Sequence, residues 1–544
     1  MWDVAVKAKR ASGRRGEATI FEQKSPNEPS PWIVTHYRTA SRWAGANRSI
    51  IMVGVMAVAF ALAYTIQPLF YSNQNTYLAH AVAAVPGSRL GSDWFIGTAD
   101  ALPVFSALLA VLLMIGDWSV YLATLAVFAV YFVALYLVAH RASGMLKDHP
   151  AAWALAAALI VVHTPFMEGL GTRYLTEGVA EQLVLGPAIQ PSVSGVLMIV
   201  AIALFQRDRL RMAAVTLGLT PLLHGTYLAS VCILTAGFAL SLLREPRRSP
   251  GVVLQAGALF GVLLVAATGV AARVLQADTP GLIEQARNIL VDFRIPHHAE
   301  PAVWLRTLQV PVAVVLVAGA AIASRDQRTR YLLAASLAMI VVLTIAAMML
   351  DSDVLKLLFP WRLSTVLVPV SAATLIGFSG YHLTSWLMSR WQPLGRSISV
   401  MAALTAAACA VGGVLVTADR FSRGGDTDER RVAALVRDQG LPGAIYLVDP
   451  DWSAFRLASD TAIVVDMKSN PYAPGDVVEW WSRVHTLNGL YDGPEGRCAD
   501  WTTTMARYGA TAVVSPLGRL DGCPGLCAVA EVGNQEIHRL CSVN

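Results

Sequence analysis

The sequence of residues 331–350 is YLLAASLAMIVVLTIAAMML, and it contains no charged side chain. A helix needs roughly 20 apolar residues to cross the hydrocarbon core of a bilayer. This stretch therefore predicts a membrane-spanning helix. Apolar segments of this kind recur along most of the chain, at 50–70, 103–116, 118–139, 151–166, 191–206, 212–223, 225–243, 252–275, 304–323, 331–350, 362–388 and 397–417.

The composition agrees with a membrane protein. Of the 544 residues, 55% are hydrophobic and 15% are charged, whereas about a quarter of the residues in a soluble globular protein are charged. The net charge is +5, which is expected when Lys and Arg are retained on the cytoplasmic side. Because no basic patch is interleaved with aromatic side chains, we do not expect nucleic acid as a partner.

Basic loops between the apolar segments predict the orientation of the chain, since Lys and Arg are enriched in cytoplasmic loops. We place the basic, partly disordered N-terminus, residues 1–49, on the cytoplasmic side. The basic loops expected on the same side of the membrane contain Arg141, Lys147, Arg207, Arg209, Arg211, Arg244, Arg247, Arg248, Arg325, Arg328, Arg330, Arg390 and Arg396. The outer side then receives the loops 71–100, 167–190, 276–303 and 351–361.

This alternation leaves a single crossing for residues 103–139, which hold two apolar runs. We therefore expect the shorter run, 103–116, to be a half-helix or a re-entrant element. The predicted fold is an all-α polytopic membrane bundle over residues 50–417, with about eleven crossing helices and one half-helix.

The C-terminal residues have a different composition. A polar linker, 418–435, precedes residues 436–544, where short apolar runs alternate with an amphipathic segment, as in a small soluble α/β domain. Asp449, Asp451 and Asp466 follow the apolar runs, where turn formation is the common role of Asp and ligand binding the alternative. The expected elements are strands at 444–448, 461–465 and 510–514, a helix at 474–484 and a hairpin at 527–541.

Four of the six cysteines lie in this domain: Cys498, Cys523, Cys527 and Cys541. An even set confined to one soluble domain is typical of disulfides formed in an oxidising compartment. The spacing of Cys523 and Cys527 also fits a metal knuckle, but no set of His ligands accompanies it. We expect two disulfides of unspecified pairing, no metal site, and an extracytoplasmic location.

Asp93 is the candidate general base in the first outer loop. A partly desolvated carboxylate at the mouth of a membrane cavity can deprotonate an acceptor hydroxyl. The alternative is that Asp93 caps a turn beside the interfacial Trp94. Asp100 directly precedes an apolar run, which is the usual setting of a helix cap.

A second group of residues could bind phosphate. Arg294, His297 and His298 lie together in the third outer loop, and Arg362 begins the apolar segment that follows Phe359-Pro360-Trp361. Guanidinium and imidazole groups donate to phosphate oxygens. The alternatives are a structural role or a metal site for the two histidines, and membrane snorkelling for Arg362.

Three further residues are candidates for a polar cavity. His224 lies at a short turn between two apolar segments, where it is either a satisfied core residue or a functional one. Asn75 belongs to the first outer loop, and Lys356 lies six residues before Arg362 and could assist it.

The order of these parts, with Asp93 in the first outer loop, resembles the GT-C superfamily of membrane glycosyltransferases. Locally, Arg294-Ile-Pro-His-His298, His224-Gly225 and Phe359-Pro-Trp-Arg362 resemble uncharacterised bacterial membrane proteins that are similar to that superfamily. Two features depart from it: Asp93 is followed by Trp94 rather than by a second acid, and Ala101-Leu-Pro103 replaces a Lys-Pro-Pro segment. The resemblance implies an inverting enzyme of a bacterial-type plasma membrane that takes a sugar from a polyprenyl-phosphate carrier.

Under this resemblance, Asp93 activates the hydroxyl of a glycan, lipid or protein acceptor. Arg294, His297, His298 and Arg362 hold the departing lipid phosphate, and a requirement for a divalent cation is left open. The competing hypotheses are a lipid-linked glycan polymerase or ligase, a transporter or flippase, and a non-enzymatic membrane scaffold. No clear internal repeat of broken helices favours a transporter.

Overall fold

A computed structural model describes residues 48–146, 148–245, 249–274, 278–391, 394–424, 427–440, 443–493 and 497–541. The predicted N-terminal segment 1–49 lies almost wholly outside these ranges, as do Lys147, Arg247 and Arg248. Residues 52–544 form one compact unit. The features below lie in that unit, apart from the first turn of the helix Arg48–Ala63.

Long apolar helices dominate the first four fifths of the chain. Within the described residues, six helical stretches are long and apolar enough to cross a membrane. They contain α5 (Asp117–Ala142), α11 (Leu228–Leu243), α12 (Pro250–Val274), α17 (Gln327–Leu350), α19 (Ser364–Arg390) and α20 (Leu394–Arg423). The run 331–350 thus lies in a helix, as predicted.

Other apolar helices are shorter than the segments predicted for them. The helix Arg48–Ala63 ends seven positions before residue 70, where Pro68 follows. The predicted half-helix is α4, Pro103–Ile115, which has 13 residues and is therefore about 20 Å long, less than a bilayer core of about 30 Å. The remaining short apolar helices are α6 (Ala151–Val162), α9 (Gly195–Gln206), α10 (Leu210–Leu223) and α16 (Gln309–Ala323).

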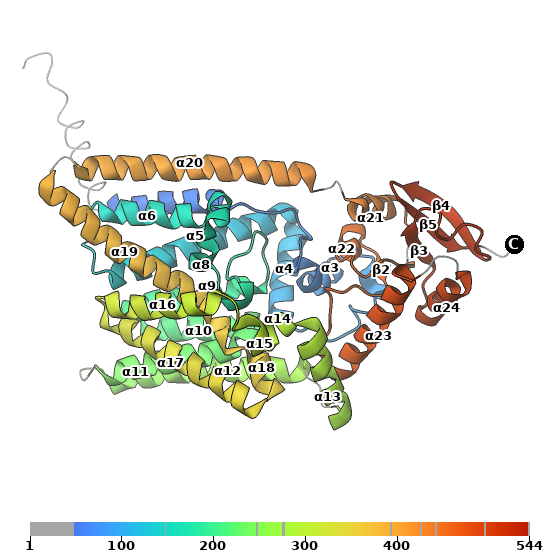
Figure 1. Cartoon of the computed structure of the whole chain (residues 1–544), viewed down its shortest axis with the longest axis horizontal. Coiled ribbons are helices and arrows are strands. Elements are labelled where there is room, and N and C mark those ends of the chain that lie inside the picture. The colour runs from blue at the N-terminus through green and yellow to red at the C-terminus, as the bar shows by residue number, and fades with distance from the viewer. Residues whose placement is uncertain are drawn as a thin grey trace, which may run out of the picture. The chain divides into compact units, whose positions relative to one another are not determined.

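Apart from α4, these helices pack side by side around a shared apolar core (Figure 1), whereas the buried side chains of α4 form a second cluster with the 71–100 loop. Helix α19 contacts α5, α6, α9 and α16, and most of its apolar stretch is buried. By contrast, α12 and α20 expose most of their apolar side chains. Leu254 and Val265 of α12 are 74% and 72% exposed, which is the surface expected of a helix that faces lipid.

Short helices fill the loops at one end of the long helices. The 71–100 loop contains α2 (Gln74–Tyr77) and α3 (Ala79–Ala83). The 276–303 loop contains α13 (Pro280–Asn288), a π-helical turn (Ile289–Arg294) and α14 (Pro296–Ala299), followed by α15 (Pro301–Trp304). The 351–361 segment contains α18 (Asp353–Leu358) and leads into a 3₁₀ turn, Pro360–Leu363.

The C-terminal domain is a five-stranded mixed sheet with helices on both faces. The strand order is β2-β1-β3-β5-β4, with β1 parallel to β2 and β3, and β5 antiparallel to β3 and β4. One apolar cluster, around Trp480 and Val513, lies on one face, and another, around Phe455 and Val514, lies on the other. The strands are β1 (Ile445–Leu447), β2 (Ala462–Ile463), β3 (Ala512–Pro516), β4 (Leu526–Val532) and β5 (Gln535–Leu540).

The helices of this domain are α21 (Asp428–Gln439), α22 (Phe455–Ser459), α23 (Pro474–Tyr491) and α24 (Cys498–Tyr508). The stretch predicted as a linker is largely helical, because α20 continues to Arg423 and α21 begins at Asp428. The predicted disulfides are present, and they join Cys498 to Cys523 and Cys527 to Cys541. The first fixes α24 to the loop before β4, and the second closes the terminal hairpin.

Candidate anion-binding site

A buried ion-pair network joins the 71–100 loop to the C-terminal domain. Arg456 of α22 donates from Nε to Asp93 Oδ2 at 2.8 Å and from Nη1 to Asp466. Its side chain is 1% exposed, and those of both aspartates are 0% exposed. Such burial is tolerable because the charges are paired and hydrogen-bonded.

Both oxygens of Asp93 are already occupied. Oδ1 accepts from the Phe95 backbone N–H at 2.9 Å, and Oδ2 accepts from the Ile463 backbone N–H at 2.9 Å in addition to Arg456. The structure therefore places Asp93 where it binds one part of the chain to another. Its role as a general base stays a prediction.

Arg294 lies at the end of the π-helical turn, half-buried against the C-terminal domain. Its Nε donates to Asn470 Oδ1 at 3.0 Å, and its Nη2 donates to the Lys468 carbonyl at 3.1 Å. The same carbonyl accepts from Thr76 Oγ1 at 2.8 Å. Residues 468–470 thus connect the first and third loops.

Five basic side chains gather here, and we call them the cationic cluster: Arg294, His297, His298, Arg362 and Lys468. The pKa of His298 is lowered to about 3, mainly by burial and further by the neighbouring His297, Arg362 and Arg294. The pKa of His297 is also lowered, mainly by burial and further by Arg294 and Lys468. Burial and Arg294 likewise lower the pKa of Lys468, against a smaller opposing effect of Asp466. The two histidines and Lys468 therefore all experience the positive charge of Arg294.

The arginines and the lysine of the cluster have no acidic partner in the part of the chain that the structure describes. Among the residues that the structure describes, no carboxylate lies within ion-pair distance of Arg294, Arg362 or Lys468. Half-buried cations without counterions attract anions, because the surrounding protein screens their charge less than water does. The cluster thus has the electrostatic character of an anion site.

Lys356, a predicted member of the cavity, is placed differently. Its Nζ lies 2.8 Å from Asp351, 3.4 Å from Glu300 and 3.6 Å from Asp353. Its charge is therefore neutralised by three carboxylates.

Aromatic and imidazole groups border the cluster on its bundle side. The guanidinium of Arg362 lies 5.8 Å from the ring centroid of Tyr227, and His224 packs edge-on against Tyr77 and Tyr227. His224 is 4% exposed, and its Nδ1 has no hydrogen-bond partner among the described atoms, while Nε2 bonds to Thr226 at 2.9 Å. His224 and Arg362 are close enough to interact electrostatically.

A pocket between the 71–100 loop and the C-terminal domain adjoins the cluster through Tyr77, Asn470 and Tyr472. Tyr77 and burial together raise the pKa of Tyr472, to which Tyr77 is also hydrogen-bonded. The pocket also contains His80 and the half-buried Asp100, whose Oδ1 accepts from the Leu102 N–H at 2.8 Å. Asp100 therefore closes a turn just before α4, whose N-cap is Leu102, and also lines the pocket.

The structure brings together all four residues predicted to bind phosphate, Arg294, His297, His298 and Arg362, with His224 beside them. Asn75 instead lies buried at the domain contact, where its Nδ2 donates to Ser453 at 3.5 Å. Sequence reasoning missed Lys468 and Tyr472. Lys468 is 174 positions from Arg294, and a Lys after a predicted strand gave no signal of this contact.

Comparison with known proteins adds one match. A family described as a domain of unknown function (DUF6798) matches residues 427–487. No curated protein matches the chain. The matched residues include Arg456, Lys468 and Asn470, so this domain carries the contacts to the first and third loops.

Proposed function

We propose that this chain is a polytopic membrane glycosyltransferase that binds the phosphate of a polyprenyl-phosphate sugar in the cationic cluster. The observation that carries the proposal is the convergence of Arg294, Arg362 and Lys468, none of which has an acidic partner among the residues that the structure describes. In the proposed topology about eleven helices cross the membrane and the N-terminus is cytoplasmic. The disulfides favour an extracytoplasmic C-terminal domain.

The chemical step would be an inverting displacement. A carboxylate takes the proton of the acceptor hydroxyl, and the hydroxyl oxygen attacks the anomeric carbon of the sugar. The bond from that carbon to the phosphate oxygen breaks, and the phosphate leaves with the electron pair. The cationic cluster would stabilise the charge that grows on the phosphate as the bond breaks.

Two carboxylates of the first loop compete for the role of base. Asp93 is enclosed by three donors, whereas Asp100 lines the pocket that adjoins the cluster. A base must come within about 3 Å of the proton that it removes, directly or through one water. We therefore favour Asp100 as the general base.

In this proposal the exposed apolar faces of helices such as α12 would contact the lipid.

The test is a transfer assay on the full-length protein in nanodiscs with radiolabelled polyprenyl-phosphate sugars and a membrane extract as acceptor. Transfer of label to a lipid-free or larger acceptor supports the proposal. Tight donor binding without transfer, followed by movement of the donor across the bilayer, would identify a flippase instead. Polymerised product would identify a lipid-linked glycan polymerase.

A further inference from the structure

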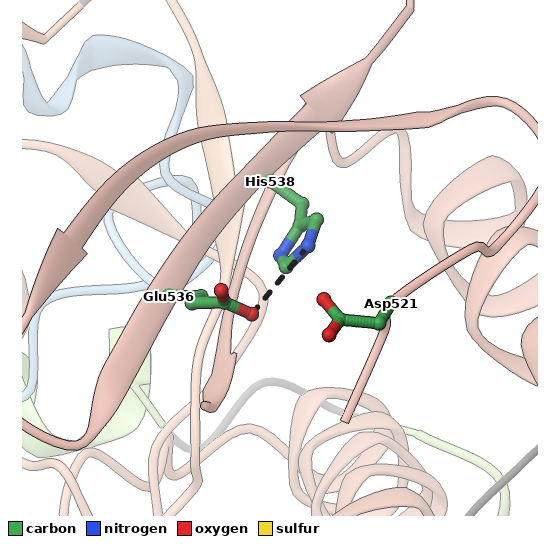
Figure 2. Close-up of side chains that lie close together, drawn as sticks. All are labelled: Asp521, Glu536 and His538. Carbon is green, nitrogen blue, oxygen red and sulfur yellow. Dashed lines mark ion pairs between the residues drawn. The ribbon is translucent and has the colours of Figure 1, made fainter. Parts of the chain in front are cut away.

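Three potential metal ligands converge at the far end of the C-terminal domain, apart from the cationic cluster. Asp521, Glu536 and His538 each offer one ligand atom, and these atoms all lie within 4.8 Å of one another. Figure 2 shows the Glu536 carboxylate and the His538 ring on β5, with the Asp521 carboxylate facing them from the loop between β3 and β4.

The strand explains why two of the ligands share a side. Side chains two positions apart on a strand point to the same face of the sheet, as Glu536 and His538 do. The antiparallel register puts Ser515 opposite Glu536 and Val513 opposite His538. Val513 belongs to the apolar cluster beneath this face, so the imidazole is surrounded by protein.

His538 is a buried polar side chain whose ring makes no hydrogen bond among the described residues. It is 2% exposed. Its Nε2 lies 3.8 Å from Glu536 Oε2, which is too long for a hydrogen bond, and its Nδ1 has no partner. Ser515 Oγ, on the same face, is also buried and has no hydrogen-bond partner among the described atoms. Buried polar groups normally have partners, so this face has unused ligand capacity.

The third ligand lies on a constrained loop. The disulfide Cys498–Cys523 fixes the chain two residues after Asp521. The backbone N–H of Gly518 donates to Glu536 Oε2 at 3.1 Å, and that of Leu517 donates to the Asn534 carbonyl at 3.0 Å. The loop is thereby held against β5 before any ligand binds, which lowers the cost of ordering a site.

We propose that Asp521, Glu536 and His538 bind a divalent transition-metal ion, with Zn²⁺ the best match. Imidazole nitrogen and carboxylate oxygen both bind Zn²⁺ at about 2.0–2.2 Å. Two such ligands on one ion stand roughly 3–4 Å apart, which matches the 3.8 Å between His538 and Glu536. The ion would fasten the Asp521 loop to the terminal hairpin, and this role does not depend on sugar transfer.

The experiment is calorimetric titration of ZnCl₂ into full-length, tag-free protein in detergent after removal of metals with a chelator. We expect one saturable equivalent and a higher Tm with Zn²⁺. Asp521→Asn alters an exposed side chain and should weaken binding at least about tenfold, with Glu536→Gln as the second ligand variant. The matched control is Asp438→Asn, which alters an exposed carboxylate on α21.

Adjacent His297 and His298 are the rival location for a bound ion, so His297→Gln is tested in parallel. Unchanged binding in His297→Gln, together with loss in Asp521→Asn, supports the proposal. The proposal is overturned if the wild-type protein binds no Zn²⁺, if Asp521→Asn and Glu536→Gln both bind it as the wild type does, or if binding is lost only with His297.

Discussion

Arg456 Nε donates to Asp93 Oδ2 at 2.8 Å, and neither side chain is more than 1% exposed. The same guanidinium pairs with Asp466, so one cation neutralises two buried carboxylates from different parts of the chain. This relationship fixes the C-terminal domain to the 71–100 loop, and thereby holds Lys468 and Tyr472 beside Arg294.

Replacing the shared cation should destabilise the domain contact. Arg456→Met leaves two buried carboxylates without their shared cation, and the loss of one member of a buried pair typically costs about 3–5 kcal/mol. We expect a lower Tm and faster proteolysis of the C-terminal domain. The control is Arg497→Met, whose pair with Asp500 is more than half exposed on both sides and should contribute less than about 1 kcal/mol. Equal effects of the two changes would contradict the account.

The two candidate bases can be separated by isosteric substitution. Asp100→Asn should lower the transfer rate at least about a hundredfold, since general base catalysis contributes about 10²–10⁴-fold, and it should leave Tm nearly unchanged. Asp93→Asn should lower Tm, because it weakens the pair with Arg456. Full activity in Asp100→Asn, with a selective loss of activity at unchanged Tm in Asp93→Asn, would restore Asp93 as the base.

Binding of the lipid phosphate should depend on pH through the histidines of the cluster. Burial and neighbouring cations hold the pKa of His298 at about 3 and lower that of His297, so both are largely neutral at pH 7 in the free protein. A bound anion raises their pKa values, so the bound state takes up protons and affinity rises as pH falls, first through His297 and only at lower pH through His298, whose pKa in the free protein is about 3.

The measurement compares donor affinity at pH 8 and pH 6. The donor is a phosphodiester, which does not titrate in this range, so a change in affinity reports on the protein. His297→Gln with His298→Gln should remove most of the pH dependence. Affinity that falls with decreasing pH, or a dependence unchanged in the double variant, would argue against contact between these histidines and the phosphate.

Sidedness can be measured with a membrane-impermeant maleimide. The free cysteines Cys232 and Cys409 are first replaced by Ala, since the other four are in disulfides. Asn534→Cys, in the terminal hairpin, should react in intact cells. Gln327→Cys, at the start of α17, should react only after permeabilisation. The reverse pattern would invert the proposed topology.

Sequence reasoning was most successful where a signal is local. The uncharged run 331–350 needs no partner to favour a helix, and β1, β3, α23 and the terminal hairpin also lie close to the predicted residues. The even number of cysteines predicted disulfides, but their pairing depends on the fold. Here Cys498 joins Cys523 across 25 positions.

The sequence alone did not predict contacts between residues that are far apart along the chain. Asp93 was a reasonable base in sequence terms, yet its environment is set by Arg456, 363 positions away. Lys356 looked like a free cation because the sequence does not show Glu300 beside it. Arg294 and His298 were singled out because they lie in a polar outer loop, and Arg362 because a cation at the start of an apolar segment is conspicuous.

The most direct test of the cationic cluster is equilibrium binding of a polyprenyl phosphate to the purified protein. Arg294→Gln combined with Arg362→Gln removes two cations that have no acidic partner in the described part of the chain, while Lys356→Gln removes a cation that three carboxylates already neutralise. We predict that the double variant binds at least about tenfold more weakly, since hydrogen bonds to charged groups contribute about 1.5–3 kcal/mol each, and that Lys356→Gln binds as the wild type does. Equal affinity of wild type and double variant, with both proteins folded, would contradict the account.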